Sequence, residues 1–154
     1  QIQHINNCND LQNVPAYGFN KQGFYGKIIR VYDGDTCFAV VYILNKLQVI
    51  NIRLNGYDSP EMRPSKSLPN REKHIAAAKE AKQVLEDKIL NKFVFIYVHK
   101  FDKYGRFLCD ISEIEQEKPY NIIANKTINN FMIEYGHGIK YDGGTKIPFQ
   151  FDKV

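Results

Sequence analysis

Three segments rich in Ile, Val, Phe and Tyr follow one another in YGKIIRVYDGDTCFAVVYILNKLQVINIRL, which spans residues 25–54. Residues 25–32 and 36–44 are the first two expected strands, and Asp33-Gly34-Asp35 interrupts them. Apolar and polar residues then alternate over 47–54, which indicates a third strand. The stretch therefore predicts three consecutive strands joined by short turns.

A helix, two more strands and a second helix are expected downstream. The first helix, over residues 71–90, is rich in Ala and Lys and follows Asn70, an expected N-cap. Strands are expected over 93–98 and 106–111, and the second helix over 121–135. This is the element order of an OB-fold, a five-stranded Greek-key barrel. The predicted fold class is α+β, mainly β: an OB barrel with two or three packed helices.

Composition divides the chain of 154 residues into three parts. Residues 1–23 are rich in Asn and Gln and are expected to form an N-terminal extension. Residues 24–142 form the predicted domain, and residues 143–154 a C-terminal tail. The three cysteines lack Cys-x-x-Cys spacing, which indicates free thiols rather than a disulfide framework or a zinc site.

Charge and hydropathy restrict the function classes. The net charge of +4 has its basic excess in residues 63–106, which suits a polyanion, although a solvated Lys-bearing helix is the simpler explanation of charge alone. The longest uncharged apolar run is far shorter than the ~20 residues of a membrane helix, so no membrane span is expected. The chain begins at Gln1 rather than Met, which indicates a cut or omitted N-terminus. Its localisation is therefore left open, with a secreted or membrane-anchored protein among the alternatives.

Acidic residues occur at two expected turns. Asp33 and Asp35 flank a glycine, which lets the backbone bring both carboxylates to one point. Asp58 and Glu61 flank Ser59-Pro60, where the proline favours an extended Ser59 and leaves its carbonyl free to face a ligand. Carboxylates and a backbone carbonyl, without His or Cys nearby, suit a hard cation such as Ca²⁺ or Mg²⁺.

Two arginines complete the set. Arg53 and Arg106 present the planar fork that binds phosphate oxygens two at a time, and Glu61 is a carboxylate able to position or deprotonate water. With a divalent cation as Lewis acid, these are the groups that phosphodiester hydrolysis needs. Taken singly, Asp33-Gly34-Asp35 is an ordinary turn and Arg53 a solvent-facing or ion-paired strand residue. Only the combination indicates a nuclease.

The stretches that carry these groups resemble the staphylococcal-nuclease (thermonuclease) family. They are V-Y-D-G-D-T (31–36), I-R-L-N-G-Y-D-S-P-E (52–61), D-K-Y-G-R (102–106) and E-Y-G-H-G (134–138), in this order. The resemblance covers residues 24–142 and implies an OB barrel, as the element order does. It also implies a Ca²⁺-dependent nuclease that cleaves DNA and RNA and leaves 3′-phosphate and 5′-hydroxyl ends.

The resemblance implies a metal site in the first half of the chain. Asp35, Asp58 and the backbone carbonyl of Ser59 would bind Ca²⁺, and Asp33 would hold a metal-bound water. Members of this family usually have Thr where Ser59 stands, a change that leaves the backbone carbonyl available.

The resemblance also implies catalytic and substrate-binding residues. Glu61 would be the general base, and Arg53 and Arg106 would bind the scissile phosphate and stabilise the transition state. Arg106 would also assist the leaving oxygen. The residues that would contact the substrate around that phosphate are Lys103, Tyr104 and Tyr141.

The expected partners are DNA and RNA, with single strands favoured, and the expected protein is a monomer without a membrane partner. The alternative is a catalytically inert OB-fold module that binds nucleic acid through a basic groove and stacked tyrosines. A module that only binds gains nothing from carboxylates placed beside phosphates. The acidic residues therefore favour the nuclease.

Overall fold

The computed structural model of the protein describes residues 21–115 and 118–151, with 118–125 described by their backbone alone. The expected N-terminal extension, residues 1–23, lies almost entirely outside the described residues. Within the described part of the chain, no helix is long and apolar enough to cross a membrane.

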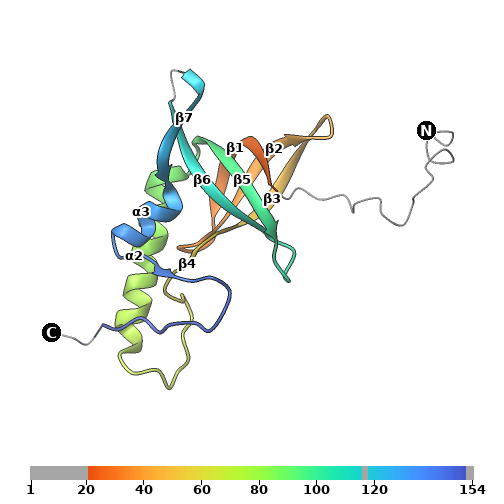
Figure 1. Cartoon of the computed structure of the whole chain (residues 1–154). Helices are drawn as coiled ribbons and strands as arrows, with labels where there is room; N and C mark the ends of the chain where they lie inside the picture. Colours follow the sequence, from red (N-terminus) through yellow and green to blue (C-terminus); the bar gives the residue numbers. More distant parts are fainter. Residues whose placement is uncertain (1–20, 116–117, 152–154) are drawn as a thin grey trace, which may run out of the picture.

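Five strands close into a barrel (Figure 1). They are β1 (Gln22–Val31), β2 (Thr36–Ile43), β3 (Lys46–Leu54), β5 (Phe93–Phe101) and β6 (Phe107–Glu115). Neighbouring strands in the order β3-β2-β1-β5-β6 pair antiparallel, and a parallel pairing of β3 with β6 closes the ring. The predicted OB barrel is confirmed.

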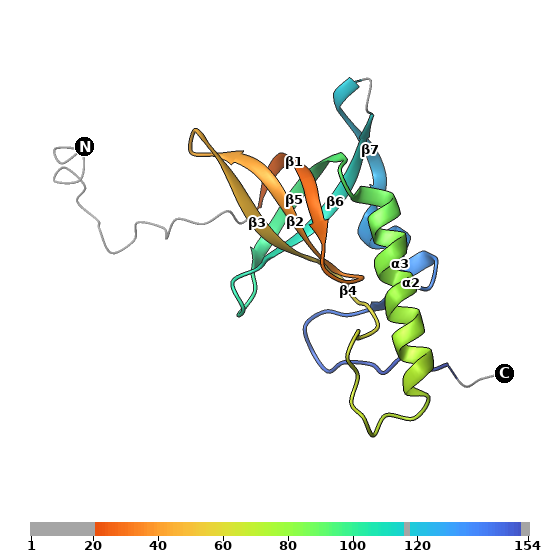
Figure 2. The ribbon, with the colours of Figure 1, turned by 180° about the vertical axis from the view of Figure 1, so that it is seen from behind.

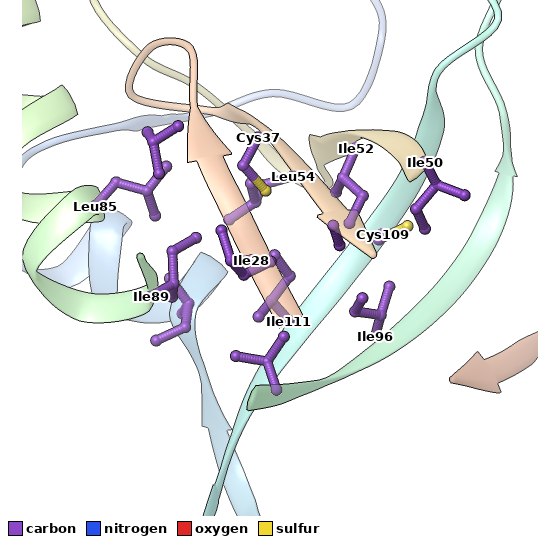
Figure 3. Close-up of a cluster of buried hydrophobic side chains, with 14 of the residues drawn as sticks. Ile28, Cys37, Ile50, Ile52, Leu54, Leu85, Ile89, Ile96, Cys109 and Ile111 are labelled. Atoms are coloured by element: carbon purple, nitrogen blue, oxygen red, sulfur yellow. The ribbon is translucent and has the colours of Figure 1, made fainter. Parts of the chain in front are cut away.

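Alternate residues of the strands fill the barrel interior. Ile28 of β1, Ile52 of β3 and Ile96 of β5 are all fully buried, and Figure 3 shows them gathered with the two cysteines Cys37 and Cys109. Both cysteines are free thiols. Burial of this apolar surface is the main stabilising contribution to the barrel.

The helix α2 (Arg71–Ile89) packs along one side of the barrel (Figure 2). Its last turns bury Leu85 and Ile89 in the same apolar cluster as the strands. The expected helix over 71–90 is thus confirmed, but Asn70 does not cap it as expected. Asn70 has a left-handed backbone, with φ of 54°, and its side chain makes no capping hydrogen bond.

The expected helix over 121–135 is wrong in its first half. Strand β7 (Lys118–Thr127) pairs with β6 at the edge of the sheet, and helix α3 (Ile128–Glu134) begins only after it. Thr127 caps α3, because its hydroxyl accepts a hydrogen bond from the backbone N–H of Asn130 at 3.2 Å. The pairing with β6 satisfies the backbone of β7 and overrides its local helical pattern.

A small second sheet pairs β4 (Tyr57–Asp58) with β8 (Ile139–Lys140), antiparallel. The side chain of Tyr57 is fully buried, and its hydroxyl donates to the carbonyl of Gly34 at 2.8 Å. A Cβ on Gly138 would lie 2.3 Å from Cδ2 of Tyr57, so only glycine allows β8 to approach this closely. Tyr57 therefore ties the β1–β2 turn, β4 and β8 together.

Candidate active site

Twelve residues from five segments line a cleft of about 410 Å³ at one end of the barrel. The segments are the β1–β2 turn, the end of β3, β4 with the residues after it, the β5–β6 turn and the residues after β8. The cleft brings together all ten residues that the sequence predicted for the site, and adds Pro60 and Lys146. The lining residues are Asp33, Asp35, Arg53, Asp58, Ser59, Pro60, Glu61, Lys103, Tyr104, Arg106, Tyr141 and Lys146.

The β1–β2 turn is held by backbone hydrogen bonds and by close packing. Asp35 N–H donates to Oδ1 of Asp33 at 3.1 Å, and Leu54 N–H donates to the carbonyl of Asp35 at 2.8 Å. A Cβ on Gly34 would lie 2.7 Å from Cβ of Ser59 and 2.8 Å from Cβ of Ala81. Glycine is needed here because the turn is pressed against the residues after β4 and against α2.

Arg53 lies between the two carboxylates proposed from sequence as metal ligands. Its Nη2 donates to Oδ1 of Asp58 and lies 3.4 Å from Oδ2 of Asp35, while Nη1 donates to the carbonyl of Leu54 at 2.8 Å. Asp35, Arg53 and Asp58 are all buried, with exposed fractions of 7%, 8% and 8%. The guanidinium therefore holds two buried carboxylates together that would otherwise repel each other.

Ser59 contributes more than its backbone carbonyl. Its N–H donates to Oδ2 of Asp35 at 2.9 Å, and its hydroxyl donates to the same oxygen at 2.8 Å. Thr36 donates to the other carboxylate oxygen at 3.0 Å. These three hydrogen bonds fix the orientation of Asp35, a function that the sequence did not assign to the Ser59 hydroxyl.

Burial and a neighbouring carboxylate disfavour the ionised form of Asp33 in the β1–β2 turn. Burial and the charge of Asp35 raise the pKa of Asp33 from 3.8 to about 6. A positive charge placed near these carboxylates would favour their ionised forms and offset both effects.

The β5–β6 turn positions Arg106. Oδ2 of Asp102 accepts from Nε of Arg106 at 2.6 Å, and Oδ1 accepts from the N–H groups of Tyr104 at 2.8 Å and Arg106 at 2.9 Å. Burial raises the pKa of Asp102, but hydrogen bonds from Arg106 and Tyr104 outweigh it and lower the pKa below 3.8. Asp102 is thus a positioning residue, which the sequence showed as part of a motif but without a role.

Lys146 is the cleft residue that sequence reasoning missed. Its Nζ lies 3.4 Å from Oδ2 of Asp58 and 3.6 Å from Oε1 of Glu61. Burial lowers the pKa of Lys146, but attraction by these two carboxylates outweighs it and raises the pKa. The stretch Gly143-Gly144-Thr145-Lys146 lacks the order of a phosphate-binding loop and predicts only a turn, so Lys146 reaches the cleft only through the fold.

The donor set fits a hard cation that takes several ligands from water. Asp35, Asp58 and the Ser59 carbonyl provide oxygen donors alone, which are the ligands of Ca²⁺ and Mg²⁺. Among the described residues, no three His, Cys, Asp or Glu side chains are close enough to form a complete metal site.

Comparison with known proteins agrees with this fold. The family of staphylococcal nuclease homologues matches residues 51–148, from the middle of β3 to the tail after β8. An uncharacterized protein of Methanocaldococcus jannaschii is 27% identical over 157 residues, which cover 92% of this chain and 71% of that protein. The family match extends over more than half of the chain and includes Arg53, Glu61 and Arg106. The chain therefore belongs to the staphylococcal nuclease homologue family.

Proposed function

We propose that the protein is a Ca²⁺-dependent nuclease that hydrolyses phosphodiester bonds of DNA and RNA and leaves 3′-phosphate ends. One observation carries the proposal: two buried carboxylates, two arginines and an exposed Glu61 line the same cleft. Buried carboxylates are costly beside a phosphate unless a cation offsets their charge.

The four acidic residues and the two arginines of the cleft each have a role in this reaction. Arg53 and Arg106 bind the non-bridging oxygens of the scissile phosphate, and Arg106 stabilises charge on the leaving oxygen. Glu61, whose side chain is 63% exposed, orients the attacking water and accepts its proton. Asp35, Asp58 and the Ser59 carbonyl would hold Ca²⁺, which would supply Lewis-acid charge next to the phosphate, and Asp33 would hold a water beside the ion.

The β5–β6 turn supplies contacts to the nucleic-acid strand beside the scissile phosphate. Tyr104 is 72% exposed, with Nζ of Lys103 at 5.2 Å and Cζ of Arg106 at 5.4 Å from its ring centre. An exposed ring beside two cations suits an unpaired base and its phosphate. With Tyr141 on the same cleft wall, this arrangement supports single-stranded DNA and RNA as substrates.

The second candidate is an OB-fold module that binds nucleic acid without cleaving it. It is favoured by the ion pairs of Asp35 and Asp58 with Arg53 and of Asp58 with Lys146, which already neutralise carboxylates that a metal would need. A binding module of this kind predicts affinity for single strands that is unchanged by chelator.

A nuclease assay separates the two candidates. Purified protein is incubated with single-stranded and duplex DNA and RNA in Ca²⁺, Mg²⁺ or EDTA, and the product ends are analysed. We expect cleavage in Ca²⁺, with single strands cut faster, no cleavage in EDTA, and 3′-phosphate products. Arg106→Ala should abolish cleavage, whereas Arg30→Ala, an exposed arginine stacked on Phe38 outside the cleft, should not. Binding without cleavage in every metal would favour the inert module.

A further inference from the structure

A mainly apolar pocket of about 270 Å³ adjoins the catalytic cleft. Its walls come from the loop between β4 and α2, the first turn of α2 and the segment after β8. It shares Asp58, Ser59, Glu61 and Lys146 with the cleft, so the two are continuous. The residues that belong to this pocket and not to the cleft are Pro64, Ser65, Leu68, His74, Ile147, Pro148 and Phe149.

A second neighbouring pocket, of about 400 Å³, shares a different set of residues with the cleft. Arg106 and Tyr104 line this second pocket but not the apolar one, whereas Glu61 and Lys146 line the apolar pocket but not the second. The cleft therefore opens into one pocket beside its proposed base and into another beside the arginine that stabilises the leaving oxygen.

The chemistry of the reaction assigns an occupant to each pocket. In an in-line displacement, the attacking water and the leaving oxygen lie on opposite sides of phosphorus. The leaving 5′ oxygen belongs to the nucleoside that follows the scissile phosphate, which places that nucleoside in the pocket beside Arg106. The nucleoside that keeps the phosphate on its 3′ oxygen then has the pocket beside Glu61 within reach.

We propose that the apolar pocket binds the base of the nucleoside that retains the 3′-phosphate. The inference rests on the proposed nuclease function and adds a second base-binding site to it. The pocket is smaller than the roughly 300–1,000 Å³ of sites for drug-sized ligands, which suits one flat ring system.

The walls match the surfaces of a nucleobase. Leu68, Pro148 and Phe149 offer apolar contact to its faces, while Ser65 and His74 offer hydrogen-bonding groups to its edge. The ring centre of Phe151 lies 4.6 Å from that of His74 and 6.1 Å from that of Phe149, so Phe151 packs between these two walls. Lys146, at the boundary of pocket and cleft, lies where the attached phosphate would enter.

Two substrates that differ on one side of the phosphate test the pocket. Thymidylyl-(3′→5′)-thymidine has a base on both sides, whereas thymidine 5′-(methyl phosphate) keeps only the leaving nucleoside. We expect Phe149→Ala and Leu68→Ala each to lower kcat/KM for the dinucleotide by roughly tenfold, because each loses contact with the base. Hydrolysis of the methyl ester should be unchanged in both variants. Phe93→Ala, which removes an aromatic ring 53% exposed and outside both pockets, should change neither rate.

The pocket is overturned by an unchanged preference for the dinucleotide in both variants, and by an equal loss on both substrates in a variant whose thermal denaturation matches that of wild type. Hydrolysis of the methyl ester by each variant also reports an intact cleft, so a misfolded variant is recognised at once. Using residues from two separate segments guards against an effect of local unfolding in either one.

A binding measurement separates this inference from the proposed activity. Thymidine 3′-monophosphate is titrated into the protein, and the ring signals of His74 are followed by NMR. We expect saturable shifts that weaken in Phe149→Ala. Shifts in a protein that cleaves nothing would refute the nuclease and support the pocket. The absence of shifts would refute the pocket, whether or not the protein cleaves.

Discussion

Arg53 and Arg106 both line the cleft, but they differ in burial. The side chain of Arg53 is 9% exposed and lies between Asp35 and Asp58, whereas that of Arg106 is 26% exposed and pairs with Asp102. A buried cation whose removal leaves two carboxylates unpaired has a structural function in addition to any catalytic one. We therefore expect substitution of Arg53 to lower the free energy of unfolding more than substitution of Arg106.

We predict that Arg53→Ala lowers the free energy of unfolding by about 3 kcal/mol, because Asp35 and Asp58 are left buried without a partner. Arg106→Ala should lower it by less than about 1 kcal/mol. Both variants should lose hydrolysis. Urea denaturation at pH 7 in EDTA measures the difference, and an Arg53→Ala protein as stable as wild type would contradict this assignment.

Lys146 competes with any cation for the same carboxylates, because it pairs with Asp58 and Glu61. We predict that Lys146→Gln tightens Ca²⁺ binding by up to about fivefold, a modest effect because the side chain is 60% exposed. Isothermal titration with Ca²⁺ measures it. Lys140→Gln, at an exposed position that does not line the cleft, is the matched control. Weaker Ca²⁺ binding in Lys146→Gln would show that the lysine supports the cation site instead.

Asp35 and Lys146 differ in how far their place in the site could be predicted from the sequence. Asp35 sits in a short motif with Asp33, and Asp58 sits in another with Glu61, so local spacing was enough to nominate them. Lys146 lies in a stretch, residues 143–146, whose pattern predicts only a turn, and its contact with Asp58 depends on the path of the chain after β8. A contact made only by tertiary structure leaves no local pattern to read.

At the scale of elements, Asn129 joins α3 to the barrel. Its side chain accepts from the N–H of Ile111 at 3.0 Å and donates to the carbonyls of Asn55 at 2.8 Å and Cys109 at 2.9 Å. Asn129 is 3% exposed, so these backbone groups have little water to replace the side chain. The helix is thus fixed to β6 and to the turn after β3 by one amide.

We predict that Asn129→Ala lowers the free energy of unfolding by about 2–3 kcal/mol, because buried backbone groups lose their partners. Asn130→Ala, the same substitution at the exposed neighbour, should change it by less than about 0.5 kcal/mol. Thermal and urea denaturation measure both. Equal stability of the two variants would mean that other contacts hold α3 in place.

Prediction of helices and strands succeeded where the hydrophobic pattern was strong. It failed where pairing with a neighbouring strand determines the conformation. The helix α2 was found because its buried positions recur at helical spacing, including Ala81, Leu85 and Ile89. Strand β7 was missed because its sequence is compatible with a helix and its extended form depends on pairing with β6. Thr127 was the local signal for the start of α3, because its hydroxyl accepts the capping hydrogen bond from the backbone N–H of Asn130.

For the whole molecule, folding creates the proposed cation site. Asp35 comes from the β1–β2 turn and Asp58 from β4, and both pair with Arg53 only in the folded chain. We predict that Ca²⁺ raises the free energy of unfolding, by about 2.7 kcal/mol at a concentration one hundred times its Kd. Thermal denaturation with Ca²⁺ and with EDTA measures this. Asp58→Asn should abolish the increase and Asp87→Asn, an exposed residue of α2, should keep it. An equal increase in both variants would place the cation elsewhere.

The pairing of Asp58 with Ile139 in the small sheet joins residues more than half the chain apart, and the pairing of β3 with β6 joins residues more than a third of the chain apart. During translation, Asp35, Arg53 and Asp58 are synthesised long before Arg106 and β8. Contacts between such distant segments form only after both have been made, and they close at an entropic cost. The growing chain thus carries half of the cleft without the other half. An activity that needs both halves of the cleft would therefore appear only after β8 has been made.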